Sequence, residues 1–180
     1  MSLSVDGVIL TGVEIDVALH CDDWQQASPP VVMLCQRAAA AALVAAADPC
    51  NNCELSIVLA DDAAVRDLNR DWRDRDVPTN VLAFPGDTEA TNGQPLLIGD
   101  VIVAYGVTCA EATRDGKTLA NHLSHLVVHG TLHLLGYDHE NDAEAHAMEA
   151  LETRILGGLG IADPYADGPD MESAASDRDG

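Results

Sequence analysis

Three histidines, four and six residues apart, constrain this chain more than any other feature of its sequence. They lie in the segment HGTLHLLGYDH as His129, His133 and His139, with Gly136 between the last two. Four residues are slightly more than one helical turn, so the first two imidazoles project from the same helical face. A glycine in the left-handed conformation ends a helix and lets the chain turn back. The spacing therefore predicts that all three histidines meet at one metal ion.

The ligand set and its spacing indicate which metal and which chemistry to expect. Three neutral imidazoles are typical of Zn²⁺, and a site with three protein ligands keeps a fourth position for water, as catalytic zinc centres do. We therefore expect one zinc ion per chain. The same spacing occurs in metzincin peptidases, but the residue after the first histidine, their general-base glutamate, is here Gly130. A peptidase of that class is disfavoured.

Four further polar residues lie close to this motif. Asp138 and Glu140 flank the third histidine and are either groups that orient ligands or exposed loop carboxylates. His122 and His125 lie seven and four residues before the first histidine, where they face the same side of the helix. We expect these two histidines to support the ligands or to pack in the core rather than to bind the ion.

The charge of the chain limits what it binds. Asp and Glu number 30 against nine Lys and Arg, for a net charge of −21. So acidic a protein does not adhere to nucleic acid or to anionic membranes through its overall field. Four of the nine bases nevertheless fall within ten residues: Arg66, Arg70, Arg73 and Arg75. Any basic surface is therefore local.

The first three of these arginines, four and three residues apart, form a stripe along one side of a helix. Such a stripe holds phosphates through bidentate contacts. Aspartates run beside it at the same interval, however: Asp67, Asp71 and Asp74. A solvated face of salt bridges is the alternative. Trp72 continues the apolar face of Val65 and Leu68, which predicts a core anchor rather than a platform for base stacking.

Hydrophobic periodicity and breaker residues predict one α+β domain over residues 1–165. Strands are expected at 12–20, 54–60, 80–84 and 100–104, and the third of these, between two prolines, suits a sheet edge. Helices are expected at 31–47, from 61 to a point before Pro78, and at 105–114, 118–135 and 143–156. From about residue 166 to 180 the composition predicts a disordered acidic tail.

The sequence has neither a membrane-spanning segment nor a signal peptide, and this predicts where the protein is found. It contains no run of about 18 apolar residues, and its first residues do not form a signal peptide. We therefore expect a cytoplasmic protein without a membrane partner.

Four blocks of the sequence resemble the YbeY family of bacterial rRNA maturation factors. The longest are HLVVHGTLHLLGYDHE (residues 125–140) and LNRDWRDRDVPTNVLAFP (68–85); the others are Gly99-Asp100 and Asp163-Pro164-Tyr165. They appear in family order from about residue 54 to 165. The resemblance implies a zincin-like fold with a mixed sheet of about four strands and, with the helices above, about five helices. The chain departs from the family where Trp72 replaces Tyr, Arg75 replaces Lys and Ala83 replaces Ser.

The resemblance also implies a function. The family is described as single-strand-specific, metal-dependent endoribonucleases that act in 16S rRNA 3′-end maturation and ribosome quality control. His129, His133 and His139 match its zinc ligands, and Arg73 matches the arginine of its basic cleft. We therefore expect catalytic roles for Arg73 and His129, with RNA contacts from Arg73 and from the other three arginines: Arg66, Arg70 and Arg75.

The resemblance also predicts a substrate and partners, and two alternative functions remain open. The substrate would be the single-stranded 3′ region of 16S rRNA, presented by the small ribosomal subunit and its assembly proteins, and no DNA partner is expected. One alternative is a ribosome-assembly factor with weak or no hydrolysis. Another is a different zinc hydrolase.

Overall fold

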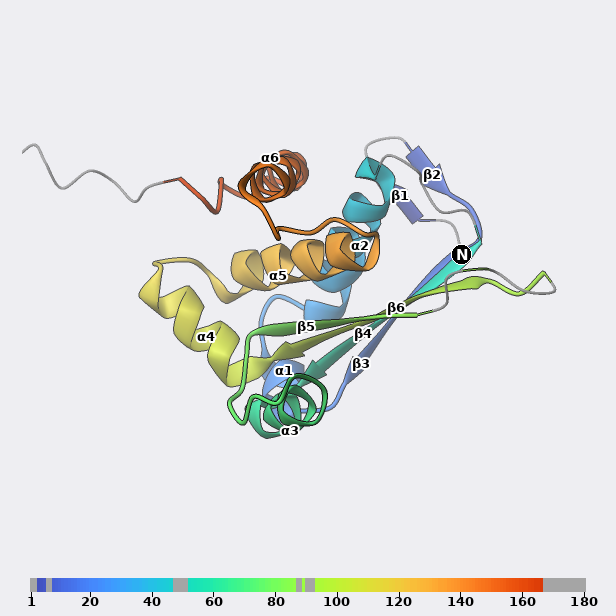
Figure 1. Cartoon of the computed structure of the whole chain (residues 1–180). Coiled ribbons are helices and arrows are strands. Elements are labelled where there is room, and N and C mark those ends of the chain that lie inside the picture. The colour runs from blue at the N-terminus through green and yellow to red at the C-terminus, as the bar shows by residue number, and fades with distance from the viewer. Residues whose placement is uncertain (1–2, 6–7, 47–51, 87–88, 90–92, 167–180) are drawn as a thin grey trace, which may run out of the picture.

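A four-stranded mixed sheet holds the other elements in place (Figure 1). The computed structural model describes residues 3–5, 8–46, 52–86, 89 and 93–166. The strand order is β3-β4-β6-β5, and only β5 runs antiparallel to its neighbour. The strands are β3 (Val13–Leu19), β4 (Cys53–Ala60), β5 (Val81–Pro85) and β6 (Leu96–Ala104). The predicted α+β class and the four-stranded sheet are confirmed, and β5 is the predicted edge strand.

In the described part of the chain, six helices accompany the sheet, one more than predicted. They are α1 (Asp22–Gln26), α2 (Val31–Ala45), α3 (Asp62–Arg73), α4 (Tyr105–Arg114), α5 (Leu119–Leu134) and α6 (Asp142–Gly158). The additional helix, α1, has five residues, too few to produce a periodic pattern. Its Trp24 is fully buried and donates a hydrogen bond from Nε1 to the carbonyl oxygen of Ala60 at 3.0 Å. A short hairpin of β1 (Leu3–Val5) and β2 (Val8–Leu10) was also not predicted.

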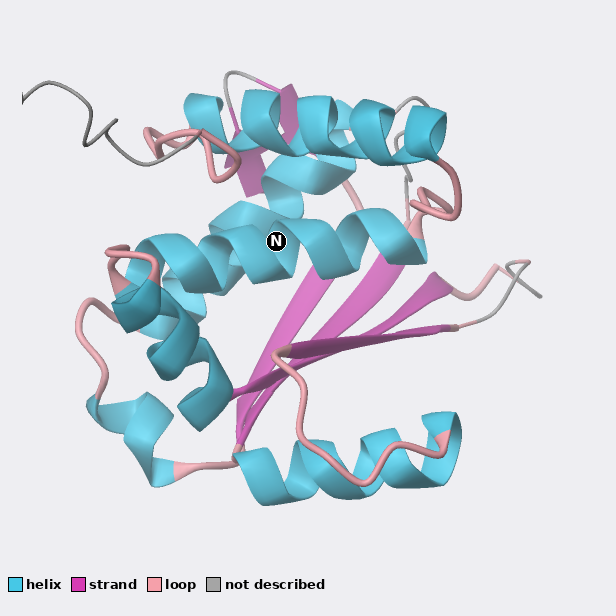
Figure 2. Ribbon diagram, turned by 60° about the vertical axis from the view of Figure 1, so that its left-hand side comes forward, coloured by secondary structure: helices cyan, strands magenta, loops and turns pink. Residues whose placement is uncertain are grey.

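The helices form layers on both sides of the sheet (Figure 2). Helices α2 and α5 pack on one face, α6 lies over them, and α3 packs against the opposite face. The main core lies between the sheet and α2, α5 and α6. A second, smaller core lies under α3 and is built from Ala60, Val65, Leu82 and Ala104. Helix α5, which carries the histidine motif, is thus fixed between the sheet and α6.

The last turn of α3 departs from the sequence prediction. Asp61 caps the helix as predicted, because its carboxylate accepts a hydrogen bond from the amide of Ala64 at 2.8 Å. Val65 is fully buried and Leu68 packs against the small core. The prediction that Trp72 is a core anchor is wrong, because 71% of its surface is exposed. The last turn lies beyond the small core, and Phe84 of β5 is the aromatic ring that meets Trp72 there.

Two further expectations concern the ends and the membrane. Of the predicted tail, residues 167–180 lie outside the described part of the chain. Among the described residues, no helix combines the length and the apolar character that crossing a bilayer requires.

Candidate active site

Local hydrogen bonds at the end of α5 bring the third histidine back to the first two. The helix begins at a Thr118 cap and ends at Leu134. Gly136 follows with a φ of 89°, which is the left-handed conformation predicted for it. The amide of Tyr137 donates to the carbonyl of Leu132, and that of Gly136 to the carbonyl of His133, both at 3.0 Å. This pair of bonds is the Schellman motif, and it reverses the chain toward the helix it has just left.

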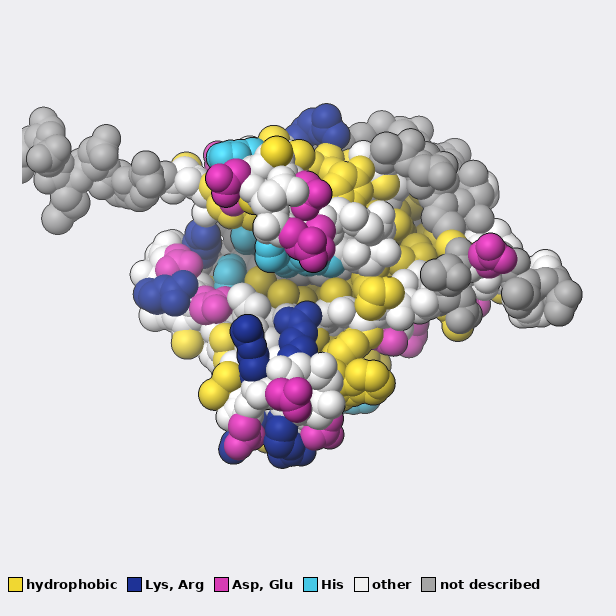
Figure 3. Space-filling model, viewed as in Figure 1, with side chains coloured by type: hydrophobic (Ala, Val, Ile, Leu, Met, Phe, Trp, Pro, Cys, Tyr) yellow, Lys and Arg dark blue, Asp and Glu magenta, His cyan; other side chains and the backbone are white. Residues whose placement is uncertain are grey.

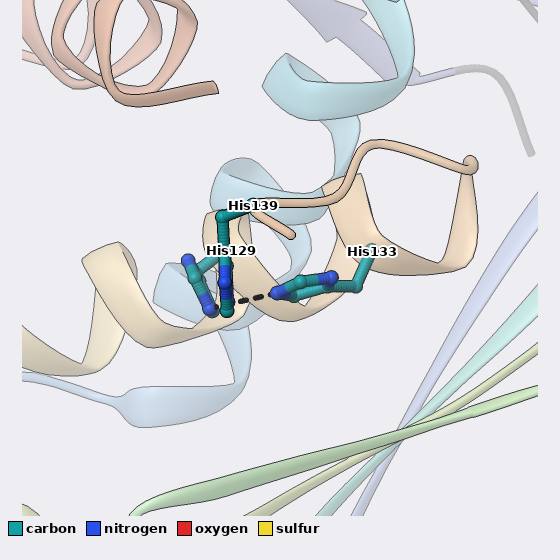
Figure 4. Close-up of side chains that lie close together, drawn as sticks. All are labelled: His129, His133 and His139. Carbon is teal, nitrogen blue, oxygen red and sulfur yellow. Dashed lines mark hydrogen bonds between the residues drawn. The ribbon is translucent and has the colours of Figure 1, made fainter. Parts of the chain in front are cut away.

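His129, His133 and His139 form one cluster, as predicted (Figure 4). Each offers a ring nitrogen, and the three nitrogens all lie within 4.8 Å of one another. The Nε2 atoms of His129 and His133 are 3.0 Å apart. Two nitrogens bound to one tetrahedral zinc at the usual bond length lie roughly 3.3 Å apart. The donor set is therefore compatible with a zinc ion.

A buried carboxylate determines how the first of these imidazoles is oriented. Glu152 of α6 is fully buried, and its Oε1 accepts a hydrogen bond from Nδ1 of His129 at 2.5 Å. With the proton of the ring on Nδ1, the lone pair of His129 is on Nε2, the atom that faces His133. The other oxygen of Glu152 lies 3.1 Å from Nε2 of His125 and also accepts a hydrogen bond from the hydroxyl of Tyr165.

This network changes the protonation preferences of its members. Burial alone would raise the pKa of Glu152, but the hydrogen bonds from His125, His129 and Tyr165 outweigh it and lower the pKa to about 2. Glu152 is therefore a carboxylate at neutral pH. Burial, followed by repulsion from the neighbouring imidazoles, lowers the pKa of His133 below its ordinary value. A neutral imidazole is the form that binds metal.

The segment after α6 closes this network from outside. The amide of Tyr165 donates to Oδ1 of Asp163 at 2.9 Å, and the same oxygen accepts a bond from the hydroxyl of Thr153 at 3.1 Å. The ammonium of Lys117 donates to the carbonyl of Pro164 at 3.2 Å. These contacts hold the tyrosine hydroxyl against Glu152. The Asp-Pro-Tyr block of the sequence thus has a structural role beside the histidine cluster.

Sequence reasoning gave no role to Glu152, although the sequence contains a signal for it. Met148, Leu151 and Ile155 form the buried side of α6, and Glu152 is the acidic residue among them. A carboxylate on the apolar face of a helix requires a partner in the fold. The partner is the histidine motif, 23 residues earlier in the chain.

The histidine cluster opens into a cavity of about 530 Å³ between α5 and β5. Histidines line one side of this hollow, and Lys and Arg side chains border its lower rim (Figure 3). The cavity is lined by the three clustered histidines and by Arg73, together with Ala83 and Pro85 of β5. A guanidinium and a candidate metal centre therefore face the same space.

Arg66 and Arg70 differ from Arg73 because both form ion pairs with aspartates. Arg66 forms a bidentate ion pair with Asp76, at 2.7 and 2.9 Å. Arg70 pairs with Asp67 at 2.9 Å and with Asp71 at 3.0 Å. These pairs form the solvated face of salt bridges that was the alternative from the sequence. Among the described residues, no ion pair is formed by Arg73 or Arg75.

Gly130 packs against the sheet. A methyl group added at this position would lie 2.8 Å from Cγ1 of Val101 on β6 and 3.4 Å from Cγ2 of Val81 on β5. No side chain fits there unless Val101 shifts or the helix moves away from the strands. The position that carries the general base in metzincins is thus occupied here by a helix–sheet contact.

The remaining polar residues near the motif lie outside the cluster of three. The carboxylate of Asp138 accepts a hydrogen bond from the amide of His139 at 2.8 Å, so it contacts the backbone of a candidate ligand. Glu140 is exposed. His122 is buried and its Nε2 lies 2.8 Å from a carboxylate oxygen of Glu111. As expected, His122 and His125 are not members of the cluster of three histidines: His122 is buried against Glu111, and His125 contacts Glu152.

Comparison with known proteins reveals relatives over most of the chain. The family model described as Endoribonuclease YbeY matches residues 24–160. A protein named Endoribonuclease YbeY from Paramagnetospirillum magneticum is 56% identical over 159 residues, which cover 86% of this chain and 97% of the relative. One of the same name from Azorhizobium caulinodans is 52% identical, with the same coverage. The solution structure of TM1509 from Thermotoga maritima has a TM-score of 0.54 at 22% identity and covers 85% of this chain and 99% of that protein. It shows a shared fold.

Proposed function

This chain belongs to the YbeY family of endoribonucleases, and from that membership we propose that it is a zinc-dependent endoribonuclease that cleaves single-stranded RNA. The observation that carries the proposal is one cavity that joins a three-histidine cluster with an arginine free of ion pairs among the described residues. Phosphodiester cleavage needs a group that activates or polarises and a cation that holds the phosphate, and the cavity has candidates for both.

The protein residues have separate tasks in this proposal. His129, His133 and His139 would hold Zn²⁺, which when bound polarises a phosphoryl oxygen and lowers the pKa of water. Arg73 would hold the phosphate and stabilise the negative charge that grows in the transition state. Glu152 keeps the Nδ1 proton of His129 in place, so that Nε2 is directed at the cavity.

The products of cleavage identify the nucleophile. Gly130 has no side chain that could act as the metzincin general base, and its contact with the sheet leaves no room for one. Two nucleophiles are then open, water and the 2′-hydroxyl of the RNA itself. Attack by the 2′-hydroxyl expels the 5′-oxygen and leaves a 2′,3′-cyclic phosphate and a free 5′-hydroxyl. Attack by water that expels the 3′-oxygen leaves a 5′-phosphate and a free 3′-hydroxyl. Mass spectrometry of the two new ends distinguishes the routes.

For the cellular substrate, we propose the 3′ region of 16S rRNA on the small ribosomal subunit, reached in the cytoplasm with assembly proteins. The net charge of −21 supports a presented substrate, because the overall field does not collect RNA from solution. Arg73, and more weakly Arg66, Arg70 and Arg75, are the proposed contacts to that RNA.

The test is cleavage of an unstructured RNA that contains the 16S 3′ region by rigorously purified protein. His133→Ala removes a candidate ligand, Arg73→Glu reverses the charge in the cavity, and His146→Ala replaces an exposed histidine outside the cluster as a matched control. We expect one zinc per chain by elemental analysis in wild type and in the His146 variant, and loss of cleavage in the other two.

The outcomes separate the proposal from its rivals. Equal cleavage by the His133 variant would mean a contaminating nuclease. Stable binding to the small subunit without cleavage by any preparation would instead favour an assembly factor. Hydrolysis of peptide or ester substrates would favour another zinc hydrolase.

A further inference from the structure

Trp72 is a large aromatic side chain that the fold leaves in solvent. It is 71% exposed and belongs to neither core cluster, whereas the other tryptophan, Trp24, is fully buried. An indole buries 150–250 Å² when it packs, so an exposed one has much apolar surface available for a ligand. The small core is filled by other residues of α3, chiefly Val65. Trp72 therefore contributes little to folding.

The indole nevertheless has a defined support. The ring of Phe84 lies with its centroid 5.8 Å from that of Trp72, at an interplanar angle of 59°. Phe84 in turn packs against the small core under α3. The tryptophan is thus backed by an anchored ring on one side while most of its surface faces solvent. Such a supported ring is suited to stacking, because little side-chain entropy is lost when a flat ligand binds.

The position of Trp72 relative to the cavity follows from β5. Side chains alternate along a strand, so Ala83 and Pro85 line the cavity while Phe84, between them, points to the other side and meets Trp72. Within the described sheet, β5 pairs with β6 alone and has one open edge. An RNA strand that left the cavity across this open edge would pass from the side of β5 that carries Ala83 to the side that carries Phe84, where Trp72 lies.

Two arginines close to the indole in sequence are available to contact a polyanion. Arg73 follows Trp72 directly and lines the cavity, and Arg75 lies two residues further along. The two arginines that precede Trp72 in the cluster are committed to aspartates, as described above, whereas Arg73 and Arg75 form no ion pair with described residues. An exposed aromatic ring next to guanidinium groups that form no ion pair with described residues is a combination by which proteins bind single-stranded nucleic acid.

We propose that Trp72, backed by Phe84, is the stacking platform for one unpaired base of the RNA strand whose phosphate Arg73 holds. The proposal rests on the proposed function and deepens it, because it gives a physical reason for a single-stranded substrate. A base inside a duplex has neighbours on both faces, whereas an unpaired base has a free face for the indole. Every base has such a face, so the platform tolerates different sequences.

Tryptophan fluorescence provides a direct test, because the chain has two tryptophans and one of them is shielded. Zinc-loaded protein is mixed rapidly with a single-stranded oligoadenylate, and emission is recorded before cleavage. We expect quenching by the single strand, little quenching by the same strand annealed to its complement, and none in Trp72→Leu, where buried Trp24 is the remaining emitter.

Binding constants measured by anisotropy with a labelled oligoadenylate complete the test. Trp72→Leu keeps apolar bulk without an aromatic face and should weaken binding about 5- to 150-fold, the loss of one base stack. Trp72→Phe should stay within about threefold of wild type, because it retains a ring. The matched control is Met33→Ala, which changes an exposed apolar residue on a different helix, α2, and should not change the affinity.

Each outcome supports or overturns the stacking platform independently of cleavage. Wild-type affinity in Trp72→Leu overturns it, even if the protein cleaves RNA. Quenching and weakened binding without cleavage in any preparation support it while the proposed nuclease activity fails. If Trp72→Leu instead abolishes self-association in sedimentation and leaves RNA affinity unchanged, Trp72 belongs to a protein interface and the proposal is overturned.

Discussion

The carboxylate of Glu152 accepts a hydrogen bond from Nδ1 of His129 at 2.5 Å, and this contact joins α6 to the candidate metal centre on α5. The bond assigns the ring proton to Nδ1 and leaves Nε2 as the nitrogen that faces His133. The orientation of a candidate ligand is thereby set by a helix that contributes no ligand itself.

Weaker metal binding is the first expectation from this contact. Glu152→Gln should lower zinc affinity about 10-fold and Glu152→Ala up to about 100-fold, because the imidazole loses its charged acceptor. Competition with a chromogenic chelator measures the affinity. Glu144→Gln, at an exposed carboxylate on the same helix, is the control and should bind zinc as wild type does. Unchanged affinity in both Glu152 variants would contradict the orienting role.

A side chain at position 130 should destabilise the fold. Gly130→Ala places a methyl group 2.8 Å from Val101, and we expect a loss of about 1–3 kcal/mol in the free energy of unfolding. Gly157→Ala is the matched change on α6, where nothing lies within 4 Å, and should be neutral or stabilise by up to about 1 kcal/mol. Urea denaturation compares them. If Val101→Ala fails to relieve the Gly130→Ala loss in the double variant, the steric explanation is wrong.

The arginines should divide into two classes in kinetics. Arg73→Gln should lower kcat/KM for RNA cleavage about 100-fold or more, because it removes the cation that faces the histidines. Arg70→Gln should stay within about threefold, because its exposed guanidinium is already paired with Asp67 and Asp71. Initial rates on the same RNA provide the comparison. Equal losses would mean that the salt-bridged face contributes to the reaction as much as Arg73 does, which would contradict the division.

Salt should weaken RNA binding only gently. Each phosphate that a single strand presents to a cation contributes about −0.7 to the slope of log affinity against log salt concentration. Two arginines without ion pairs among the described residues, Arg73 and Arg75, therefore predict a slope between about −1 and −2. Fluorescence anisotropy at several salt concentrations measures it, with Arg75→Gln expected to reduce the slope. A slope steeper than about −4 would require basic contacts elsewhere on this acidic protein.

The histidine cluster was predictable because its geometry is local. Helical periodicity places His129 and His133 on one face, and a glycine with positive φ turns the chain back within three residues. The four strands of the sheet were likewise readable, since alternating and apolar runs have a period that distinguishes them. The three-residue strands β1 and β2 and the five-residue helix α1, which spans less than two helical turns, are too short for that signal.

The wrong and missing predictions concern residues whose environment is set by tertiary packing. Trp72 continues the apolar face of α3, yet the small core lies under Val65 and does not extend to the last turn. The place of Glu152 on the apolar side of α6 indicates a buried partner, but only the packing of α6 on α5 identifies that partner as His129. Which arginines are committed to aspartates depends on side-chain placement, because Arg66 reaches ten residues along the chain to Asp76.

The contact between Tyr165 and Glu152 also forms late in the synthesis of the chain. A polypeptide leaves the ribosome from its N-terminal end, so the sheet, α5 and all three histidines emerge before α6 and before Tyr165. The three histidines are therefore synthesised before Glu152, which contacts His129, and before Tyr165, which contacts Glu152. The hydrogen-bond network around His129 is complete only when Tyr165, its latest-synthesised member, has docked.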